Sequence, residues 1–104
     1  MDLELSKRIL NQVFEIGKKS KKNSFSVIDR NLANVFSEFE QEGFFVENPE
    51  GQAYDERRTD YQATIVGDQM HRLVITEVMK PIIYLKTGSD TKLVQKGVVI
   101  AEEK

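Results

Sequence analysis

The side chains that could carry out chemistry are few in this chain, and they are far apart in the sequence. The single histidine, His71, stands in a polar stretch, and the chain has no cysteine to share a metal with it. A Ser–His–acid triad would need a nucleophile elbow, and no such segment is present. The glycines form no phosphate-binding loop. We therefore expect His71 to be a surface residue, and we predict no metal site, no cofactor and no enzymatic activity.

Two charged runs are candidates for a binding or catalytic site. The run from Asp55 to Asp60, DERRTD, could offer a pair of carboxylates, but its mixed charges are more typical of a solvated connection before a strand. The run from Lys18 to Lys22 places four lysines in five positions and could attract an anionic partner. No aromatic residue interleaves these lysines, as a nucleic-acid platform would require. We expect a solvated turn whose cations favour the C-terminal end of the preceding helix.

Length and composition place the chain among small folded proteins. It has 104 residues, 39% of them hydrophobic and 31% charged, and its formal net charge is −2. That length fits one domain with a thin core, to which oligomerisation commonly adds burial. The charge does not predict a nucleic-acid partner. No apolar run approaches the roughly 20 residues that cross a bilayer, so we expect no membrane partner. The absence of cysteine and of an N-terminal apolar segment predicts a cytoplasmic protein.

Apolar residues recur at helical spacing in the first 43 residues. The pattern predicts one helix over residues 2–16, ended by Gly17, and a second over residues 25–41, ended by Gly43. Ser26 and Asp29 resemble a capping pair for the second helix, and Ser24 is the alternative cap. The short linker favours an antiparallel pair. Two such helices cannot enclose their own apolar faces, so either the rest of the chain or a second copy must cover them.

The period changes to that of strands after Gly43. Strands are expected near residues 44–46, 61–65, 73–79, 82–86, 93–94 and 98–100, with turn residues between them and Pro81 as an interruption. The sequence therefore predicts an α+β fold, with a helical region at 1–43 and a β-rich region at 44–104.

Four segments, in this order, resemble the C-terminal part of the GrpE family, the nucleotide exchange factors of DnaK-type chaperone ATPases. They are Phe36–Val46 (FSEFEQEGFFV), Gly51–Asp55 (GQAYD), Ile75–Lys80 (ITEVMK) and Val94–Glu102 (VQKGVVIAE). The first is similar to the end of the family's bundle helix, and the others to its Gly-x-x-Phe-Asp element, its Val-rich strand and its closing strand.

The chain departs from the family's pattern at several positions. Thr59 to Tyr61 stand where the family has His-Glu-Ala, Ile82 and Ile83 replace a Gly-Tyr pair, and Gln95 takes the place of the closing strand's arginine. The long N-terminal coiled-coil helix of the family is also missing. These departures put partner affinity and exchange activity in question, and a dimeric adaptor with the same fold but no exchange activity is the alternative.

The resemblance implies a homodimer in which two antiparallel helical hairpins form a four-helix bundle and each chain carries a small all-β wing. It implies that the wing binds the nucleotide-binding domain of a DnaK-type chaperone and promotes ADP release. The residues expected to bind the partner are Tyr84, Lys92, Gln95, Lys96 and Ile100. The residues expected at the dimer interface are Ile9, Val13, Ile16, Leu32, Val35, Phe36 and Phe39. Each assignment has an alternative. Ile100 can belong to the core, the two lysines can keep an exposed edge strand soluble, and the helix residues can pack within one chain.

Overall fold

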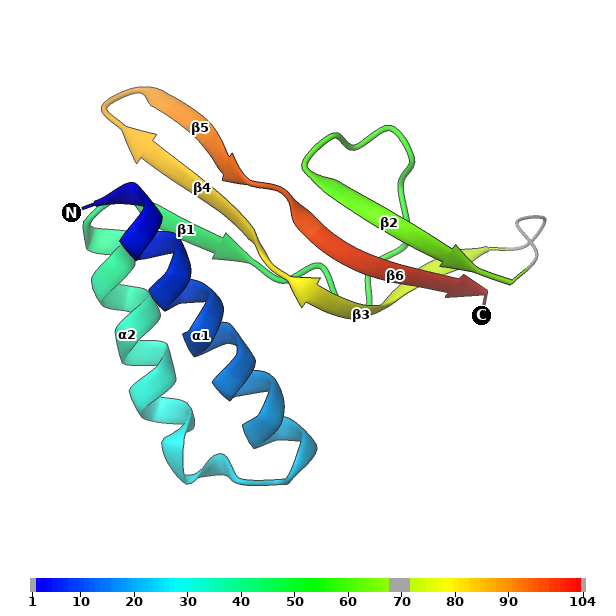
Figure 1. The fold of residues 1–104 in the computed structure, drawn as a ribbon, viewed down its shortest axis with the longest axis horizontal. Coiled ribbons are helices and arrows are strands. Elements are labelled where there is room, and N and C mark those ends of the chain that lie inside the picture. The colour runs from blue at the N-terminus through cyan, green and yellow to red at the C-terminus, as the bar shows by residue number, and fades with distance from the viewer. Residues whose placement is uncertain (1, 68–71, 104) are drawn as a thin grey trace. The chain divides into compact units, whose positions relative to one another are not determined.

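The computed structural model describes residues 2–67 and 72–103, so His71 lies outside the described residues. In that part of the chain, two α-helices are followed by six strands in two sheets, which confirms the α+β class (Figure 1). The elements are α1 (Leu3–Lys22), α2 (Asp29–Gln41), β1 (Phe44–Glu47), β2 (Tyr61–Val66), β3 (Leu73–Lys80), β4 (Ile82–Thr87), β5 (Asp90–Gln95) and β6 (Gly97–Glu103), with a 3-10 helix at Ser26–Ile28 before α2. No helix among the described residues is long and apolar enough to cross a membrane.

Helix α1 runs past the predicted end at Gly17 and continues to Lys22. The prediction was wrong because this glycine serves close packing and does not end the helix. A Cβ atom at Gly17 would lie 3.7 Å from Leu32 Cδ1, so α1 and α2 approach each other closely at this point. The helix ends at Asn23, whose backbone N–H donates to the carbonyl of Lys19 at 3.0 Å. The lysine run is therefore largely helical, and its cations lie at the negative end of the helix dipole.

Helix α2 begins four residues later than predicted, at Asp29, after the 3-10 turn. The expected capping pair of Ser26 and Asp29 does not form, since no side chain caps the first turn of α2. The Asp29 carboxylate instead lies 3.2 Å from the hydroxyl of Ser20 on α1. The predicted end of the helix at Gln41 is confirmed.

A close approach of two backbones fixes the passage from α2 into β1. Gly43 has φ of +95°, and a Cβ there would lie 2.5 Å from the carbonyl oxygen of Lys86 on β4, so only glycine fits. The Lys86 N–H donates to the carbonyl of Gly43 at 2.8 Å. Beside this junction the rings of Phe39 and Phe44 pack edge to face, with centroids 6.0 Å apart. Burial of this aromatic pair anchors the first strand to the second helix.

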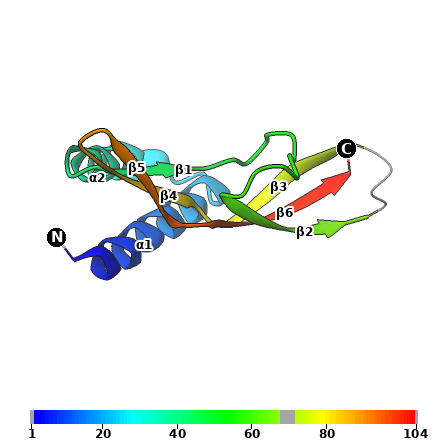
Figure 2. The same ribbon diagram turned by 90° about the horizontal axis from the view of Figure 1, so that it is seen from above.

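The strands form two three-stranded sheets, of order β1-β4-β5 and β2-β6-β3 (Figures 1 and 2). The closing strand β6 is central in the second sheet. It pairs in parallel with β2 from Tyr61↔Gly97 to Val66↔Glu102, and antiparallel with β3 with two register shifts. The long connection before β2 follows the outer edge of β3, where Ala53 bridges Val74. That connection therefore protects part of an edge that would otherwise be open to pairing.

The chain divides into two compact units, and β4 and β5 pass from one to the other. The first unit comprises residues 1–46 and 84–92, and the second comprises residues 47–83 and 93–104. The border expected between residues 43 and 44 differs from this division, because β1 and the adjoining parts of β4 and β5 belong with the helices. Buried apolar residues of the first unit are Leu10, Val13, Phe14, Phe39 and Phe44. Those of the second include Tyr61, Ile75, Val78, Ile82, Ile83, Val99 and Ala101.

Candidate partner-binding surfaces

The residues expected at a dimer interface differ widely in exposure within one chain. Val13 and Phe39 are buried, and three others are half-buried: Leu32, Val35 and Phe36. Ile9 and Ile16 remain 36% and 45% exposed. Intrachain packing therefore already occupies Val13 and Phe39, whereas the two isoleucines are open to a partner.

Ile9 and Ile16 belong to a larger exposed row on α1, which we call the α1 stripe and define as Leu5, Ile9 and Ile16. Leu5 is 42% exposed. At 3.6 residues per turn the three positions fall within about 40° of one another and span about 16 Å along the helix. Leu10 and Phe14, which point elsewhere on the helix, are almost fully buried. The apolar face of α1 is thus wider than the part that the single chain covers, which is typical of a helix with a second partner.

The five residues expected to bind a partner are divided between the two units. Tyr84 and Lys92 belong to the first unit, and Gln95, Lys96 and Ile100 belong to the second. Both lysines are exposed, and Tyr84 and Ile100 are half-buried. The side chain of Gln95, which was expected to be free, donates from Nε2 to the carbonyl of Pro81 at 2.8 Å. Lys92 lies on β5, an edge strand of the first sheet, and Lys96 lies between β5 and the central strand β6 of the second sheet, so the edge-strand alternative stays open for both lysines.

Tyr84 does contribute to a surface feature of the first sheet. A shallow apolar hollow of about 300 Å³ is lined by Phe45 of β1, Tyr84 and Lys86 of β4, and Thr91 of β5. The adjacent Phe44 is buried against α2, so the alternation of side chains along β1 leaves Phe45 on the opposite face. Sequence reasoning missed Phe45, although its place beside a buried phenylalanine in a strand indicates exposure. The hollow could take one apolar side chain of a partner beside a lysine.

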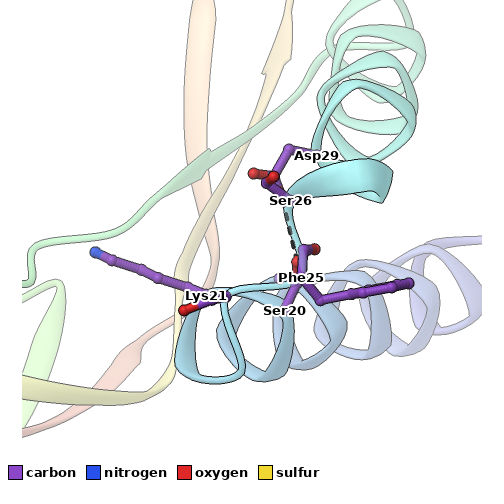
Figure 3. A pocket seen from close by; sticks show the side chains of 7 residues that line it. Ser20, Lys21, Phe25, Ser26 and Asp29 are labelled. Carbon is purple, nitrogen blue, oxygen red and sulfur yellow. Dashed lines mark hydrogen bonds between the residues drawn. The ribbon is translucent and has the colours of Figure 1, made fainter.

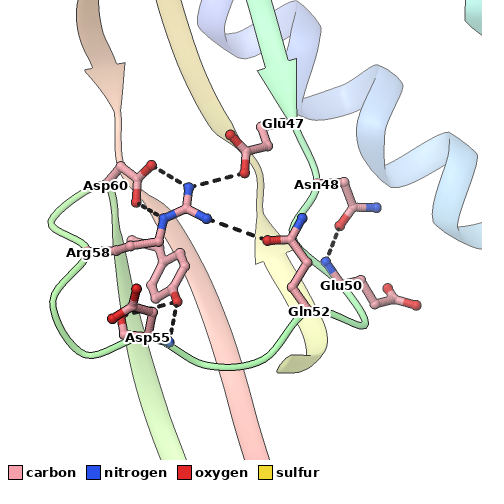
Figure 4. A network of polar contacts seen from close by, with 8 residues as sticks. Glu47, Asn48, Glu50, Gln52, Asp55, Arg58 and Asp60 are labelled. Carbon is pink, nitrogen blue, oxygen red and sulfur yellow. Dashed lines mark hydrogen bonds and ion pairs between the residues drawn. The ribbon is translucent and has the colours of Figure 1, made fainter. Parts of the chain in front are cut away.

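In the second unit, Arg58 is the centre of a polar network that holds the connection before β2 (Figure 4). Its guanidinium donates to both carboxylate oxygens of Asp60, at 2.9 and 2.5 Å, and to Glu47 at 3.1 Å. It also lies 5.0 Å from the ring centroid of Tyr61. The hydrogen bond to Asp60, above all, raises the pKa of Arg58 above its ordinary value. The run that was expected to be solvated is therefore partly held in place by these contacts, and we call Arg58 with its partners Glu47, Asp60 and Tyr61 the clasp.

The side chain of Tyr61 extends these contacts to the backbone of Asp55. The backbone N–H of Asp55 donates to the Tyr61 hydroxyl at 2.9 Å, and that hydroxyl lies 3.3 Å from the Asp55 carbonyl, to which it can donate. A hydrogen bond from Arg57 lowers the pKa of Asp55 below its ordinary value. Asp55 and Asp60 are thus each paired with an arginine, which disfavours the proton transfers that a catalytic pair must make. No group of three potential metal ligands occurs among residues 2–67 and 72–103.

The connection between α1 and α2 is held by hydrogen bonds from a buried serine (Figure 3). The Ser20 hydroxyl lies within hydrogen-bond distance of two acceptors, the carbonyl of Phe25 and the Asp29 carboxylate. The Phe25 N–H in turn donates to the Ser20 carbonyl at 2.8 Å. A surface hollow of about 540 Å³ beside these residues is lined by Gly17, Ser20, Lys21, Ser24, Phe25, Ser26 and Asp29.

Comparison with known proteins adds no relative. No family model, curated protein or solved structure matches the chain significantly. The resemblance to the GrpE family therefore stays a prediction from the residues that carry it.

Proposed function

We propose that this protein is a GrpE-like co-chaperone that works as a homodimer. In this proposal α1 and α2 form an antiparallel hairpin, two hairpins make a four-helix bundle, and the strands after Gly43 serve as a wing that binds the ATPase domain of a DnaK-type chaperone. The observation that carries the dimer is the α1 stripe, with three large apolar side chains left 36–45% exposed in a row. A second copy related by twofold symmetry would cover each stripe with the same surface of its partner.

The proposed activity is differential binding and makes or breaks no bond. A wing that prefers the open form of the ATPase domain shifts that domain toward the open form, from which ADP leaves. A preference of about 2–3 kcal/mol would change the populations roughly 30- to 150-fold. The surfaces offered for this contact are the hollow beside Tyr84 in the first unit and the exposed Lys92 and Lys96.

Release of a fluorescent ADP analogue from a DnaK-type chaperone of the same cell, followed by stopped flow, tests the proposal. We expect saturating protein to accelerate release, and Lys96→Gln to weaken the effect through lost partner contact. Lys80→Gln, which removes another exposed lysine of the second unit, is the matched control and should behave as wild type. Unchanged release at saturation would rule out the exchange activity.

A dimeric adaptor without exchange activity is the second candidate. It is favoured by Gln95, which stands where the family has an arginine and whose amide donates to the chain's own Pro81 carbonyl. Such a protein would still dimerise through α1, and it could bind a partner with no effect on nucleotide release. Calorimetric binding to the chaperone, measured beside the release assay, separates the two candidates.

A further inference from the structure

The connection between the helices carries the two most exposed large apolar side chains in the part of the chain that the structure describes. Phe25 is 53% exposed and Val27 is 72% exposed. The dimer interface that we propose at the α1 stripe does not use either of them. Two such side chains within three residues of each other need a different explanation.

These side chains are presented by an ordered backbone. Ser20, which is 4% exposed, bonds to the Phe25 backbone through its own carbonyl and its hydroxyl, so both polar backbone groups of Phe25 are engaged. Ser24 adopts φ of +55°, a conformation that non-glycine residues rarely take and that the surrounding bonds must hold. Neither constraint involves the ring of Phe25. The connection therefore holds an apolar side chain in water at a fixed place, which reduces the entropy lost on binding.

Positive charge surrounds the exposed pair. Residues 17–30 contain five basic residues and one acidic residue, although the whole chain carries a net charge of −2. Lys18 pairs with Glu15, at 3.2 Å. Lys19, Lys21 and Lys22 are exposed and form no ion pair with any described residue. The charge of this end of the helices is thus opposite to that of the molecule as a whole, which orients it toward an anionic surface.

We propose that the connection between α1 and α2 docks on the surface of an anionic lipid bilayer. Phe25 and Val27 insert at the level of the headgroups, and Lys19, Lys21 and Lys22 lie among the lipid phosphates. Lysine stems reach along apolar surface while their ammonium groups stay with the headgroups. This proposal departs from the expectation that the chain has no membrane partner, because the sequence pattern did not show that Phe25 and Val27 are left uncovered.

The size of the surface favours a bilayer over an acidic protein. A stable protein–protein interface uses about 20–30 residues on each side. The exposed pair and its lysines are far fewer, even with the residues of the hollow that Phe25 and Lys21 line. A bilayer accepts such a small footprint, because each apolar group partitions independently and each cation adds its own attraction to anionic lipid.

Co-sedimentation of the full chain with lipid vesicles tests the proposal. We expect binding to vesicles of phosphatidylcholine with one-third phosphatidylglycerol and little binding to phosphatidylcholine alone. Phe25→Ser with Val27→Ser should weaken binding by about 10- to 100-fold through the lost apolar burial. Phe45→Ser removes an exposed phenylalanine elsewhere and should change nothing. Lys21→Gln should weaken binding about fivefold, as about 1 kcal/mol per basic residue predicts, and Lys92→Gln should not.

Fluorescence gives an independent measure of insertion. The chain contains no tryptophan, so Phe25→Trp introduces a single reporter. Its emission should shift to shorter wavelength with anionic vesicles and be quenched by lipids brominated on their acyl chains. Phe45→Trp, the control, should show neither change.

Three results would overturn the proposal. One is a wild-type protein that does not sediment with anionic vesicles, and another is equal binding to neutral vesicles. The third is full binding by the Phe25→Ser, Val27→Ser variant with an unchanged circular dichroism spectrum, since the lysines alone would then hold the protein as they would hold any polyanion, including an acidic protein.

Discussion

Replacement of two isoleucines of the α1 stripe by alanine should separate the proposed dimer without unfolding the chain. Ile9 and Ile16 are 36% and 45% exposed in one chain, so a partner has about that fraction of each side chain left to bury. Full burial of an isoleucine side chain contributes about 1.5–3 kcal/mol. Counted over both residues and both copies, and allowing for the methyl group that alanine keeps, the lost stabilisation is about 2–4 kcal/mol.

That loss corresponds to a dissociation constant about 30- to 1,000-fold larger. Sedimentation velocity over a concentration series measures it directly. We expect wild type to be dimeric at tens of micromolar and the Ile9→Ala, Ile16→Ala variant to be largely monomeric there. Val27→Ala removes an apolar side chain that is still more exposed but lies outside the stripe, and it should leave the dimer intact.

Circular dichroism of the same samples shows whether the variant has kept its helices. The reasoning is refuted if wild type is a monomer throughout tens of micromolar, or if the double variant associates as tightly as wild type. The second result would place the dimer on another face, such as the half-buried Leu32, Val35 and Phe36. Phe36→Asp, which would bury an unpaired carboxylate, would then be the variant that dissociates it.

Three further predictions concern stability and can be measured by urea denaturation. Gly97→Ala should lower the free energy of unfolding by about 2 kcal/mol, because the new Cβ atom would lie 2.8 Å from the side chain of a fully buried isoleucine. Gly17→Ala lies inside a helix, and its Cβ atom would lie 3.7 Å from the nearest side chain, so it should raise the free energy of unfolding by about 0.5–1 kcal/mol. Arg58→Met should cost about 2 kcal/mol by removing the guanidinium that pairs with a mostly buried carboxylate. Arg57→Met, whose side chain is 88% exposed, should cost under about 0.5 kcal/mol, and equal effects would show that the clasp does not stabilise the fold. Ser6→Ala should stabilise the protein by about 0.5–1 kcal/mol, because the buried Ser6 hydroxyl has no hydrogen-bond partner among the described residues, and a loss of stability would reveal a partner such as a bound water.

The sequence by itself determined the order and type of the elements. Apolar spacing located both helices, the end of α2 at Gln41, and strands close to their observed positions, because periodicity and turn residues act through local geometry. It could not assign the role of Gly17, since a glycine that ends a helix and one that allows a neighbouring helix to pack closely look alike in sequence. The packing of Leu32 against that position decided between them.

Tertiary structure alone decided which side chains are available to partners. The apolar face of α1 is wide enough to serve both α2 and a second chain, so periodicity could not tell buried Val13 from exposed Ile16. The charged run before β2 is joined to β1 through Glu47, which lies 11 residues from Arg58. The exposure of a side chain and its pairing with distant residues depend on which elements contact each other in the fold. The residue pattern within a single element does not specify those contacts.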